Sequence, residues 1–374
     1  MLRVDELILR EIALPLKERF EISSGMVKDR RILILELVHP DGVSCWSECV
    51  AGEAPNYSPE TIDTAWLAIK SWVAPRVLRR TFEEPGDVRA VLEQDFRGHQ
   101  MAKAAVEMGL WALAATLREL PLARLLGGTR TRVPVGISLG IQASPAALVE
   151  RAREALAQGY RKVKMKIKPG ADYETAAAVR EALGPDAPLM VDANSAYALD
   201  RADVLARLDE LELMMIEQPL DRSDLVRHAA LQKRLRTPLC LDESIDSPRH
   251  AEDMITLGSG RIINIKPGRV GGFSASNEIH DICERAGLPV WCGGMLESGI
   301  GRAYNVALAS LPNFQLPGDL SPSARYWDRD IVTPEWTMTG DGTMEVPLDR
   351  AGLGVDVDLD RLDDLTVRHE RISV

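Results

Sequence analysis

The first fifty residues alternate between hydrophobic and polar positions, which is the pattern of strands with one buried face. Residues 7–16 form one such stretch, and residues 31–50 form a second that contains an Asp-Gly pair typical of a hairpin turn. From Ser58 onward the spacing becomes helical, and residues 99–120 continue it. The pattern therefore predicts a small sheet covered by helices, with Ser58 as the N-cap of the first helix.

Beyond Arg132 the rhythm changes to short apolar runs separated by polar loops and helix-length amphipathic segments. Eight runs follow one another: VPVGISLG, KVKMKIKP, PLMVDAN, LMMIEQP, PLCLDES, RIINIKPG, LPVWCGG and FQLPGDL. Continuous runs of this kind are typical of parallel strands buried on both faces, and helices between them predict an α/β fold with a (β/α)8-type barrel. A doubly wound open sheet is the structural alternative, but no Gly-x-Gly-x-x-Gly follows an early strand.

Composition and charge narrow the possible partners. The chain has 374 residues, 45% of them hydrophobic, with 56 acidic against 45 basic residues and a net charge of −11. This charge argues against nucleic acid or an anionic membrane as partner, but a small anionic ligand remains possible. The five cysteines lack metal-finger spacing, and no signal peptide or membrane span is evident. We therefore expect a cytoplasmic protein with reduced thiols.

Acidic residues recur at the ends of three successive predicted strands. Asp192, Glu217 and Asp242 lie one βα unit, or 25 residues, apart. Equivalent positions on neighbouring barrel strands are close in space, so these carboxylates should converge at the carboxyl-terminal rim. Three anions together require a cation or raised pKa values, and an all-oxygen cluster favours Mg²⁺. Taken singly, each acid could instead be an N-cap or loop residue.

Lysines are predicted to reach the same rim from two sides. Lys164 and Lys166 share one face of the second predicted strand, and Lys266 ends the sixth, roughly across the barrel mouth. Ammonium groups gathered beside a divalent cation would have lowered pKa values, so a neutral amine could accept a proton near neutral pH. An edge strand with one wet face is the alternative explanation of the alternating lysines.

Together these residues resemble the enolase superfamily in its muconate-lactonizing branch. The residues that carry the resemblance are Lys-Met-Lys at 164–166, Asp192 with Asn194, Glu217, Asp242 and Lys266. Residues 264–272, 291–314 and 316–327 are similar to the group that contains o-succinylbenzoate synthase and N-succinylamino acid (N-acylamino acid) racemase. The resemblance covers nearly the whole chain.

The resemblance implies roles for individual residues. The metal ligands would be Asp192, Glu217 and Asp242, and Mg²⁺ would be the cofactor, with Mn²⁺ or Co²⁺ as possible substitutes. Lys166 would be a base on one face of the substrate, and Lys266 a base or cationic stabiliser on the other. Further positions near the substrate would be Lys164, Ser138, Asn194, Gly294 and Met295.

The resemblance also implies the domain division. Residues 1–125, joined by a tail of about 325–374, would form an α+β capping domain, and residues 126–324 the catalytic barrel. Loops at residues 20–26 and 52–57 would close the pocket over the substrate. A small carboxylate is the expected substrate, and we expect the protein to be a homo-oligomer.

The implied activity is metal-dependent removal of a proton next to a carboxylate. It would serve the dehydration that yields o-succinylbenzoate for menaquinone synthesis, and also the racemisation of N-succinylamino acids; a dedicated N-acylamino acid racemase is the alternative. Arg269 could lower the pKa of Lys266 and favour racemisation. The absence of an Asp-x-Asp at residues 318–320 argues against a dipeptide epimerase. A muconate cycloisomerase-like enzyme, a Schiff-base aldolase using Lys266 and an inactive relative are more distant alternatives.

Overall fold

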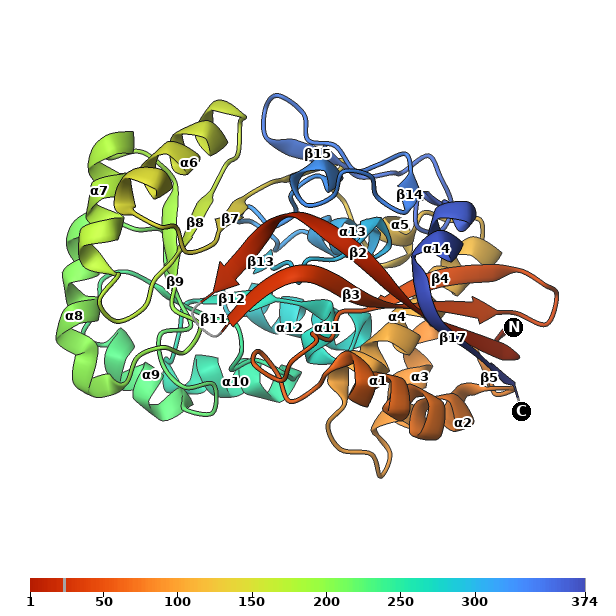
Figure 1. Cartoon of the computed structure of the whole chain (residues 1–374). Helices are drawn as coiled ribbons and strands as arrows, with labels where there is room; N and C mark the ends of the chain where they lie inside the picture. The colour runs from red at the N-terminus through yellow and green to blue at the C-terminus, as the bar shows by residue number, and fades with distance from the viewer. Residues whose placement is uncertain (23–24, 374) are drawn as a thin grey trace.

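A computed structural model describes residues 1–22 and 25–373 of the chain. Figure 1 shows an α+β part that contains both ends of the chain, beside a curved array of strands surrounded by helices. The α+β part is built on a four-stranded antiparallel sheet with the order β17-β2-β3-β4. Its strands are β2 (Glu6–Ile22), β3 (Gly25–Val38), β4 (Ser44–Cys49) and β17 (Thr366–Ser373). The predicted Asp-Gly turn joins β3 to β4, with Gly42 in the left-handed region at φ 83°.

The predicted helices follow the sheet along the chain. They are α1 (Ile62–Ala68), the π-helical turn η1 (Ile69–Val73), α2 (Ala74–Val77), α3 (Val88–Glu93), α4 (Gln100–Leu117) and α5 (Leu122–Leu125). Of these, α1 and α4 pack directly against the strands of the sheet. The prediction of Ser58 as the first N-cap is wrong. Thr61 caps α1 instead, because its side chain accepts a hydrogen bond from the backbone N–H of Thr64. Short elements complete this part: β1 (Leu2–Arg3), β5 (Thr81–Phe82) and the 3₁₀ turn η2 (Pro85–Asp87).

The second part is a parallel sheet of seven strands in sequence order from β7 to β13. The strands are β7 (Ile137–Leu139), β8 (Val163–Lys166), β9 (Leu189–Asp192), β10 (Ile216–Glu217), β11 (Leu239–Leu241), β12 (Ile262–Ile265) and β13 (Val290–Cys292). The helices between and after them are α6 (Pro145–Ala157), α7 (Tyr173–Leu183), α8 (Ala202–Arg207), α9 (Leu225–Gln232), α10 (Pro248–Leu257), α11 (Pro267–Val270), α12 (Phe273–Arg285) and α13 (Gly299–Ala309). The 3₁₀ turns η3 (Leu199–Arg201) and η4 (Leu208–Leu211) flank α8. This alternation is the predicted barrel architecture.

The eighth apolar run closes the ring without forming a regular strand. Gly318 makes an isolated parallel bridge to Val135, just before β7, and accepts a 2.6 Å hydrogen bond from the N–H of Gly136. On the other side, the N–H of Asp319 donates to the carbonyl of Cys292 at the end of β13. The segment therefore lies between the first and seventh strands, where the eighth barrel strand was expected.

The C-terminal tail returns to the first sheet. It contains the 3₁₀ turn η5 (Ser323–Arg325), then β14 (Val332–Thr333), β15 (Thr343–Glu345), β16 (Asp356–Val357) and α14 (Leu359–Leu365). β15 pairs with β6 (Arg132–Pro134), and β17 pairs antiparallel with β2 along most of its length. Among the described residues, no helix is long and apolar enough to cross a membrane.

Two buried glutamates from the α+β part hold the two parts together. Glu107 on α4 accepts hydrogen bonds from the backbone N–H groups of Phe273 and Ser274, at the start of α12. Glu48 on β4 accepts from the N–H groups of Ser298 and Gly301, at the start of α13. Each carboxyl group therefore caps the N-terminus of a barrel helix, because it accepts hydrogen bonds from N–H groups that have no partner within the helix.

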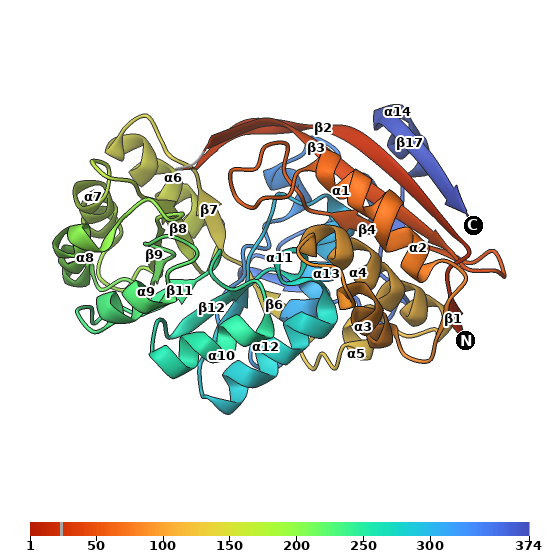
Figure 2. The ribbon, with the colours of Figure 1, turned by 90° about the horizontal axis from the view of Figure 1, so that it is seen from below.

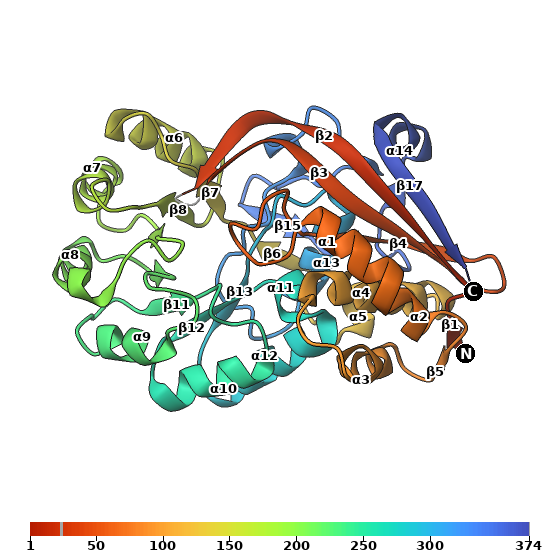
Figure 3. The same ribbon diagram turned by 60° about the horizontal axis from the view of Figure 1, so that its bottom comes forward.

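The β2–β3 hairpin reaches from its own sheet to the barrel, as Figures 2 and 3 show. Near its end, the carbonyl of Glu21 accepts a 3.0 Å hydrogen bond from the N–H of Ile141, just after β7. Gly140 permits this approach, because a Cβ atom there would lie 2.8 Å from the same carbonyl oxygen. The hairpin is therefore positioned over the carboxyl ends of the barrel strands.

Candidate active site

Three acids lie at the carboxyl ends of adjacent barrel strands. Asp192 ends β9, Glu217 ends β10, and Asp242 directly follows β11. In the strand register Glu217 is paired with Asp192 on one side and with Cys240 on the other. All three are buried, with at most 1% of their surface exposed. The structure thus places these three predicted ligands side by side on one rim.

Each acid contacts a predicted lysine. Lys166 Nζ lies 2.5 Å from Asp192 Oδ2, and Lys266 Nζ lies 2.8 Å from Asp242 Oδ2. Lys164 Nζ donates to Glu217 Oε2 at 3.2 Å and also lies 3.5 Å from Asp192. Because β8 and β12 are four strands apart in the sheet order, Lys166 and Lys266 enter the rim from different sides.

Burial and charge act in opposite directions on these groups. Burial raises the pKa of Glu217 to about 8, and the negative charge of Asp192 adds to the effect. Burial alone would raise the pKa of Asp192, but the ammonium groups of Lys166 and Lys164 hold it below its usual value. Burial would lower the pKa of Lys266, but the carboxylate of Asp242 outweighs it and raises that pKa. The rim is thus a set of mutually neutralising charges.

The acids fit a divalent ion by residue type and strand placement. Carboxylate oxygens are the donors that Mg²⁺ prefers. Glu243, beside Asp242, adds a buried carboxyl oxygen, Oε2, that has no hydrogen-bond partner, and burial raises the pKa of this residue to about 7. A metal site also needs ligand atoms that lie close together. Within the described residues, one group of three or more Asp, Glu, His or Cys side chains has all its ligand atoms within 4.8 Å of one another, and it lies in α12: His280, Asp281 and Glu284. Among the described residues, the three rim acids do not form such a group, and each of them contacts a lysine instead.

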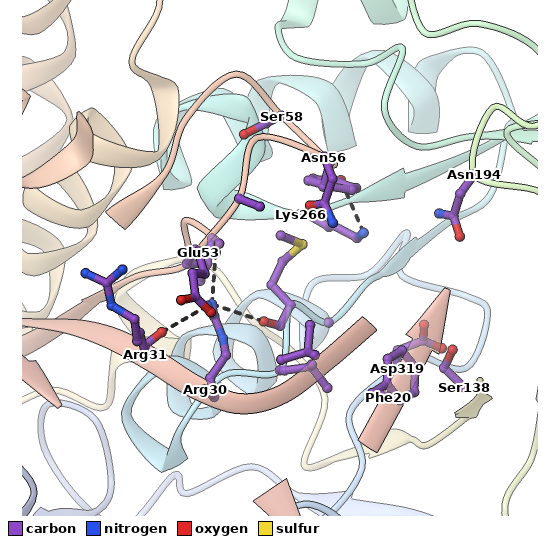
Figure 4. A pocket seen from close by; sticks show the side chains of 18 of the residues that line it. Phe20, Arg30, Arg31, Glu53, Asn56, Ser58, Ser138, Asn194, Lys266 and Asp319 are labelled. Atoms are coloured by element: carbon purple, nitrogen blue, oxygen red, sulfur yellow. Dashed lines mark hydrogen bonds between the residues drawn. The ribbon is translucent and has the colours of Figure 1, made fainter. Parts of the chain in front are cut away.

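A cavity of about 490 Å³ opens beside this rim. Every substrate-contact position that the resemblance implied lies in its wall: Ser138, Lys164, Asn194, Gly294 and Met295. Lys166 and Lys266 line the same cavity, and Figure 4 shows several of these side chains around it. The size suits a small organic ligand.

Both predicted closing loops contribute to the cavity wall. Phe20 and Val27 come from the hairpin, and most of residues 52–57 come from the loop before α1. Residues 23 and 24 of the first loop lie outside the described part of the chain. Much of the wall contributed by these loops is apolar, with Phe20, Val27 and Ala54 among its members.

Tyr57 connects the second loop to the charged rim. Its hydroxyl donates to Asp242 Oδ1 at 2.8 Å and accepts from Lys266 Nζ and Arg269 Nη1, each at 3.2 Å. Arg269 also forms an ion pair with Asp242. Arg269 therefore shares a carboxylate with Lys266. Its predicted lowering of the pKa of Lys266 stays a prediction.

Three buried polar residues at the rim were not predicted from the sequence. Asp319 lies 2.6 Å from Lys164 Nζ, Asn264 donates to Glu217 at 2.7 Å, and Glu243 accepts from Asn194 at 3.0 Å. A signal existed for Asp319, since it ends the eighth apolar run as the predicted ligands end earlier ones. Asn264 and Glu243 are detectable only once the strand register is known.

Two family models match the chain. The model of the mandelate racemase/muconate lactonizing enzyme N-terminal domain matches residues 5–127, and that of the enolase C-terminal domain-like fold matches residues 147–361. An o-succinylbenzoate synthase from Geobacillus stearothermophilus is 47% identical over 357 residues, covering 96% of this chain and 94% of that protein. An N-succinylamino acid racemase from Thermus thermophilus is 46% identical over 372 residues, covering all of both chains.

Solved structures agree with the sequence matches. The crystal structure of an enolase superfamily member from Listeria innocua superposes with a TM-score of 0.96 and 39% identity, covering all of both chains. The sequence and the overall structure thus agree on one family. The chain belongs to the mandelate racemase/muconate lactonizing enzyme family of the enolase superfamily.

Proposed function

We propose that the protein removes the proton next to a substrate carboxylate, acting as an o-succinylbenzoate synthase that also racemises N-succinylamino acids. The observation that carries this proposal is the placement of Lys166 at the end of β8 and of Lys266 directly after β12. These strands are four apart in one sheet, and both lysines line one cavity beside three buried acids at strand ends. Two amines that reach a bound molecule from different sides are what proton exchange on both faces of a carbon requires. Relatives with these two activities are 46–47% identical to the chain.

The charge of the site supports a dianionic substrate. Five acids and five basic residues are linked in the rim: Asp192, Glu217, Asp242, Glu243 and Asp319, with Lys162, Lys164, Lys166, Lys266 and Arg269. By formal charge the set is neutral, and one divalent cation would leave a surplus of two positive charges. A substrate with two carboxylates would restore neutrality, and both N-succinylamino acids and the o-succinylbenzoate precursor carry at least two.

We propose that Asp192, Glu217 and Asp242 hold the divalent ion, with Mg²⁺ as the natural occupant. Enolase-superfamily sites combine a Lys or His base with one or two Mg²⁺ ions. When bound, the ion would supply positive charge where negative charge develops on the substrate carboxylate, a contribution of several kcal/mol. Lys164, which already contacts Glu217 and Asp192, would neutralise the same carboxylate from the other side.

The lysines divide the proton transfers between them. In dehydration, Lys166 takes the α-proton and returns it to the β-hydroxyl, so that the carbon–oxygen bond breaks and water leaves. In racemisation, one lysine takes the α-proton and the other delivers a proton to the opposite face of the carbon. Because both reactions begin with the same proton removal, one site can serve both.

We also propose the division of labour between the two parts of the chain. Residues 1–125 with the tail from about 325 would select the substrate through the hairpin and the loop at residues 52–57, and residues 126–324 would carry the chemistry. The pairing of β17 with β2 and the place of both loops in the cavity wall support this division. The expected homo-oligomer and cytoplasmic location stay predictions. Light scattering of the purified protein would measure the number of subunits.

The decisive experiment is an assay of the purified protein with Mg²⁺ against the cyclohexadiene precursor of o-succinylbenzoate and against N-succinyl amino acids. We expect both substrates to react and EDTA to stop both reactions. Activity that persists after complete metal removal, together with borohydride trapping of Lys266 by a carbonyl substrate, would replace the proposal with Schiff-base chemistry. Failure with both substrates in the metal-loaded protein would reject the proposed function.

A further inference from the structure

Asp319 lies between two lysines at the edge of the cavity. Its Oδ2 atom is 2.6 Å from Lys164 Nζ, and its Oδ1 atom is 3.2 Å from Lys162 Nζ. Lys162 and Lys164 point to the same side of the chain as it enters and follows β8, and Lys162 is completely buried. The carboxylate thus joins a buried ammonium group to one that lines the cavity.

The backbone of Asp319 is fixed by its neighbours. Its N–H donates to the carbonyl of Cys292 at 2.9 Å, and its own carbonyl accepts from Arg302 Nη1 at 3.0 Å. Gly294 packs directly against it, since a Cβ atom at that position would lie 2.7 Å from the carbonyl oxygen of Asp319. The carboxylate is therefore carried on a rigid segment, and Figure 4 shows it among the residues that line the pocket.

Lys162, the completely buried lysine of this pair, packs against an aromatic ring. Lys162 Nζ lies 3.4 Å from the ring centroid of Trp291, whose Nε1 atom donates to Cys240 Sγ at 3.3 Å. A buried ammonium group is costly unless it is paired, and Lys162 is offset by the ring face on one side and by Asp319 on the other. Trp291, Lys162, Asp319 and Lys164 therefore form one connected column between the barrel interior and the cavity, in which Lys164 Nζ also lies 5.0 Å from the ring centroid of Trp291.

Lys166 is held differently. Lys166 contacts Asp192 and Asn194. The acid nearest to Lys164, by contrast, is Asp319. If Asp319 lost its charge, the remaining acids within 3.5 Å of Lys164 Nζ would be Glu217 and Asp192, both proposed metal ligands. Lys164 would then be drawn toward the place of the metal and away from the substrate.

We propose that Asp319 is a positioning residue that holds the ammonium group of Lys164 over the substrate carboxylate, with Lys162 and Trp291 supporting Asp319 from below. This inference rests on the proposed function for the meaning of Lys164. The column keeps Lys164 as a fixed positive charge, and leaves Lys166 as the amine that moves protons. A displacement of about 1 Å at such a group lowers turnover by about 10²-fold.

The test replaces Asp319 by Asn, which keeps the shape of the side chain and removes its charge. We expect Asp319→Asn to lower kcat about 10²-fold with KM changed less than about threefold, because the developing charge of the transition state is affected more than binding. Asp319→Glu, which keeps the charge, should recover part of the loss. Asp330→Asn is the matched control: it changes another buried acid, in the C-terminal tail, which accepts hydrogen bonds from Gly299 and Ser323 and does not line the cavity. It should lower thermal stability without lowering kcat.

A double-mutant cycle separates positioning from general damage. The quantity measured is the Mg²⁺ dissociation constant, by titration calorimetry without substrate. In wild-type protein, Asp319→Asn should weaken Mg²⁺ binding several-fold. In a Lys164→Met background, the same substitution should change the dissociation constant less than about twofold. Equal effects of Asp319→Asn in both backgrounds, or a kcat within threefold of wild type, would overturn the inference. Because the Mg²⁺ titration needs no turnover, it distinguishes this failure from failure of the proposed reactions. If the Asn variant does not fold, Asp319→Glu decides, and a wild-type kcat in that variant would overturn the inference.

Discussion

Glu48 gives the protein a pH-dependent stability that one substitution should remove. Burial raises the pKa of Glu48 to about 8 from an ordinary value of 4.5, and the charge of Glu297 adds to the rise, while Ser298 and Arg30 oppose it. One of its oxygens, Oε1, is buried without a hydrogen-bond partner. Between pH 4.5 and 8 the folded protein therefore keeps a proton on Glu48 that the unfolded chain has released.

The sign and size of the effect follow from proton linkage. Because the folded state binds the additional proton, the free energy of unfolding falls as the pH rises through this window, by roughly 1 kcal/mol per pH unit. The stability contributed by the neutral carboxyl is complete below pH 4.5 and lost above pH 8. Glu48→Gln carries a neutral amide at every pH, and its carbonyl oxygen can still accept from Ser298 and Gly301. The unfolding free energy of the variant minus that of wild type should therefore increase by on the order of 3 kcal/mol between pH 4.5 and pH 9.

Chemical denaturation of both proteins at pH 4.5, 6, 7.5 and 9 measures this difference directly. The difference in unfolding free energy should grow with pH inside the window and level off above it, and this change of slope is an internal control. A difference that stays constant within about 0.5 kcal/mol across the series would refute the reasoning, because Glu48 would then be ionised throughout. It would also show that the contact between β4 and α13 carries a negative charge.

Four further substitutions test other contacts. Lys166→Ala should abolish both dehydration and α-proton exchange in D₂O, followed by NMR, and full activity would reject its role as base. Lys266→Ala should stop racemisation yet leave exchange from one stereoisomer, and equal exchange of both would contradict the two-sided arrangement. Tyr57→Phe removes the hydroxyl that joins Asp242 and Lys266, so kcat/KM should fall at least about tenfold; an unchanged value in steady-state assays would show that the hydroxyl is dispensable. Glu107→Ala leaves the first N–H groups of α12 unpaired and should lower the urea-derived unfolding free energy by about 3 kcal/mol, with Glu107→Gln losing less.

The barrel could be predicted because its signal is local and repeated. Seven of the eight apolar runs became strands of one parallel sheet, and the acids at their ends came together because neighbouring strands share a register. The eighth run differs, since Pro317 and Gly318 interrupt it and a few backbone hydrogen bonds, instead of a regular ladder, join it to its neighbours. Gly318 bonds Pro134 and Gly136 on one side, and Asp319 bonds Cys292 on the other. Proline has no N–H to contribute to a ladder, so the run closes the ring as an irregular segment.

The contacts between distant segments could not be predicted in the same way. Tyr57 meets Asp242 across 185 positions of the chain, and Glu48 meets Ser298 across 250. Neither pairing has a period or a motif, because each depends on how the α+β part lies against the barrel. The N-cap at Thr61 was missed for a simpler reason: Ser58 is an equally good capping residue, and only the backbone decides between them.

The alternating lysines of β8 show how far a pattern can be interpreted. Lys162, Lys164, Lys166 and Lys168 share one face of an extended segment, yet their surroundings differ at each step. Lys162 is buried against the ring of Trp291, and Lys164 and Lys166 contact the acidic rim. The side chain of Lys168 is 43% exposed, and its Nζ atom lies 3.9 Å from Glu21. The strand therefore passes from the barrel interior through the site to solvent, and the same residue type is a buried support, a fixed charge, a proposed base and a surface group. A wet-edge strand would have exposed all four, so the burial of the first three is what favours an active-site strand over that alternative.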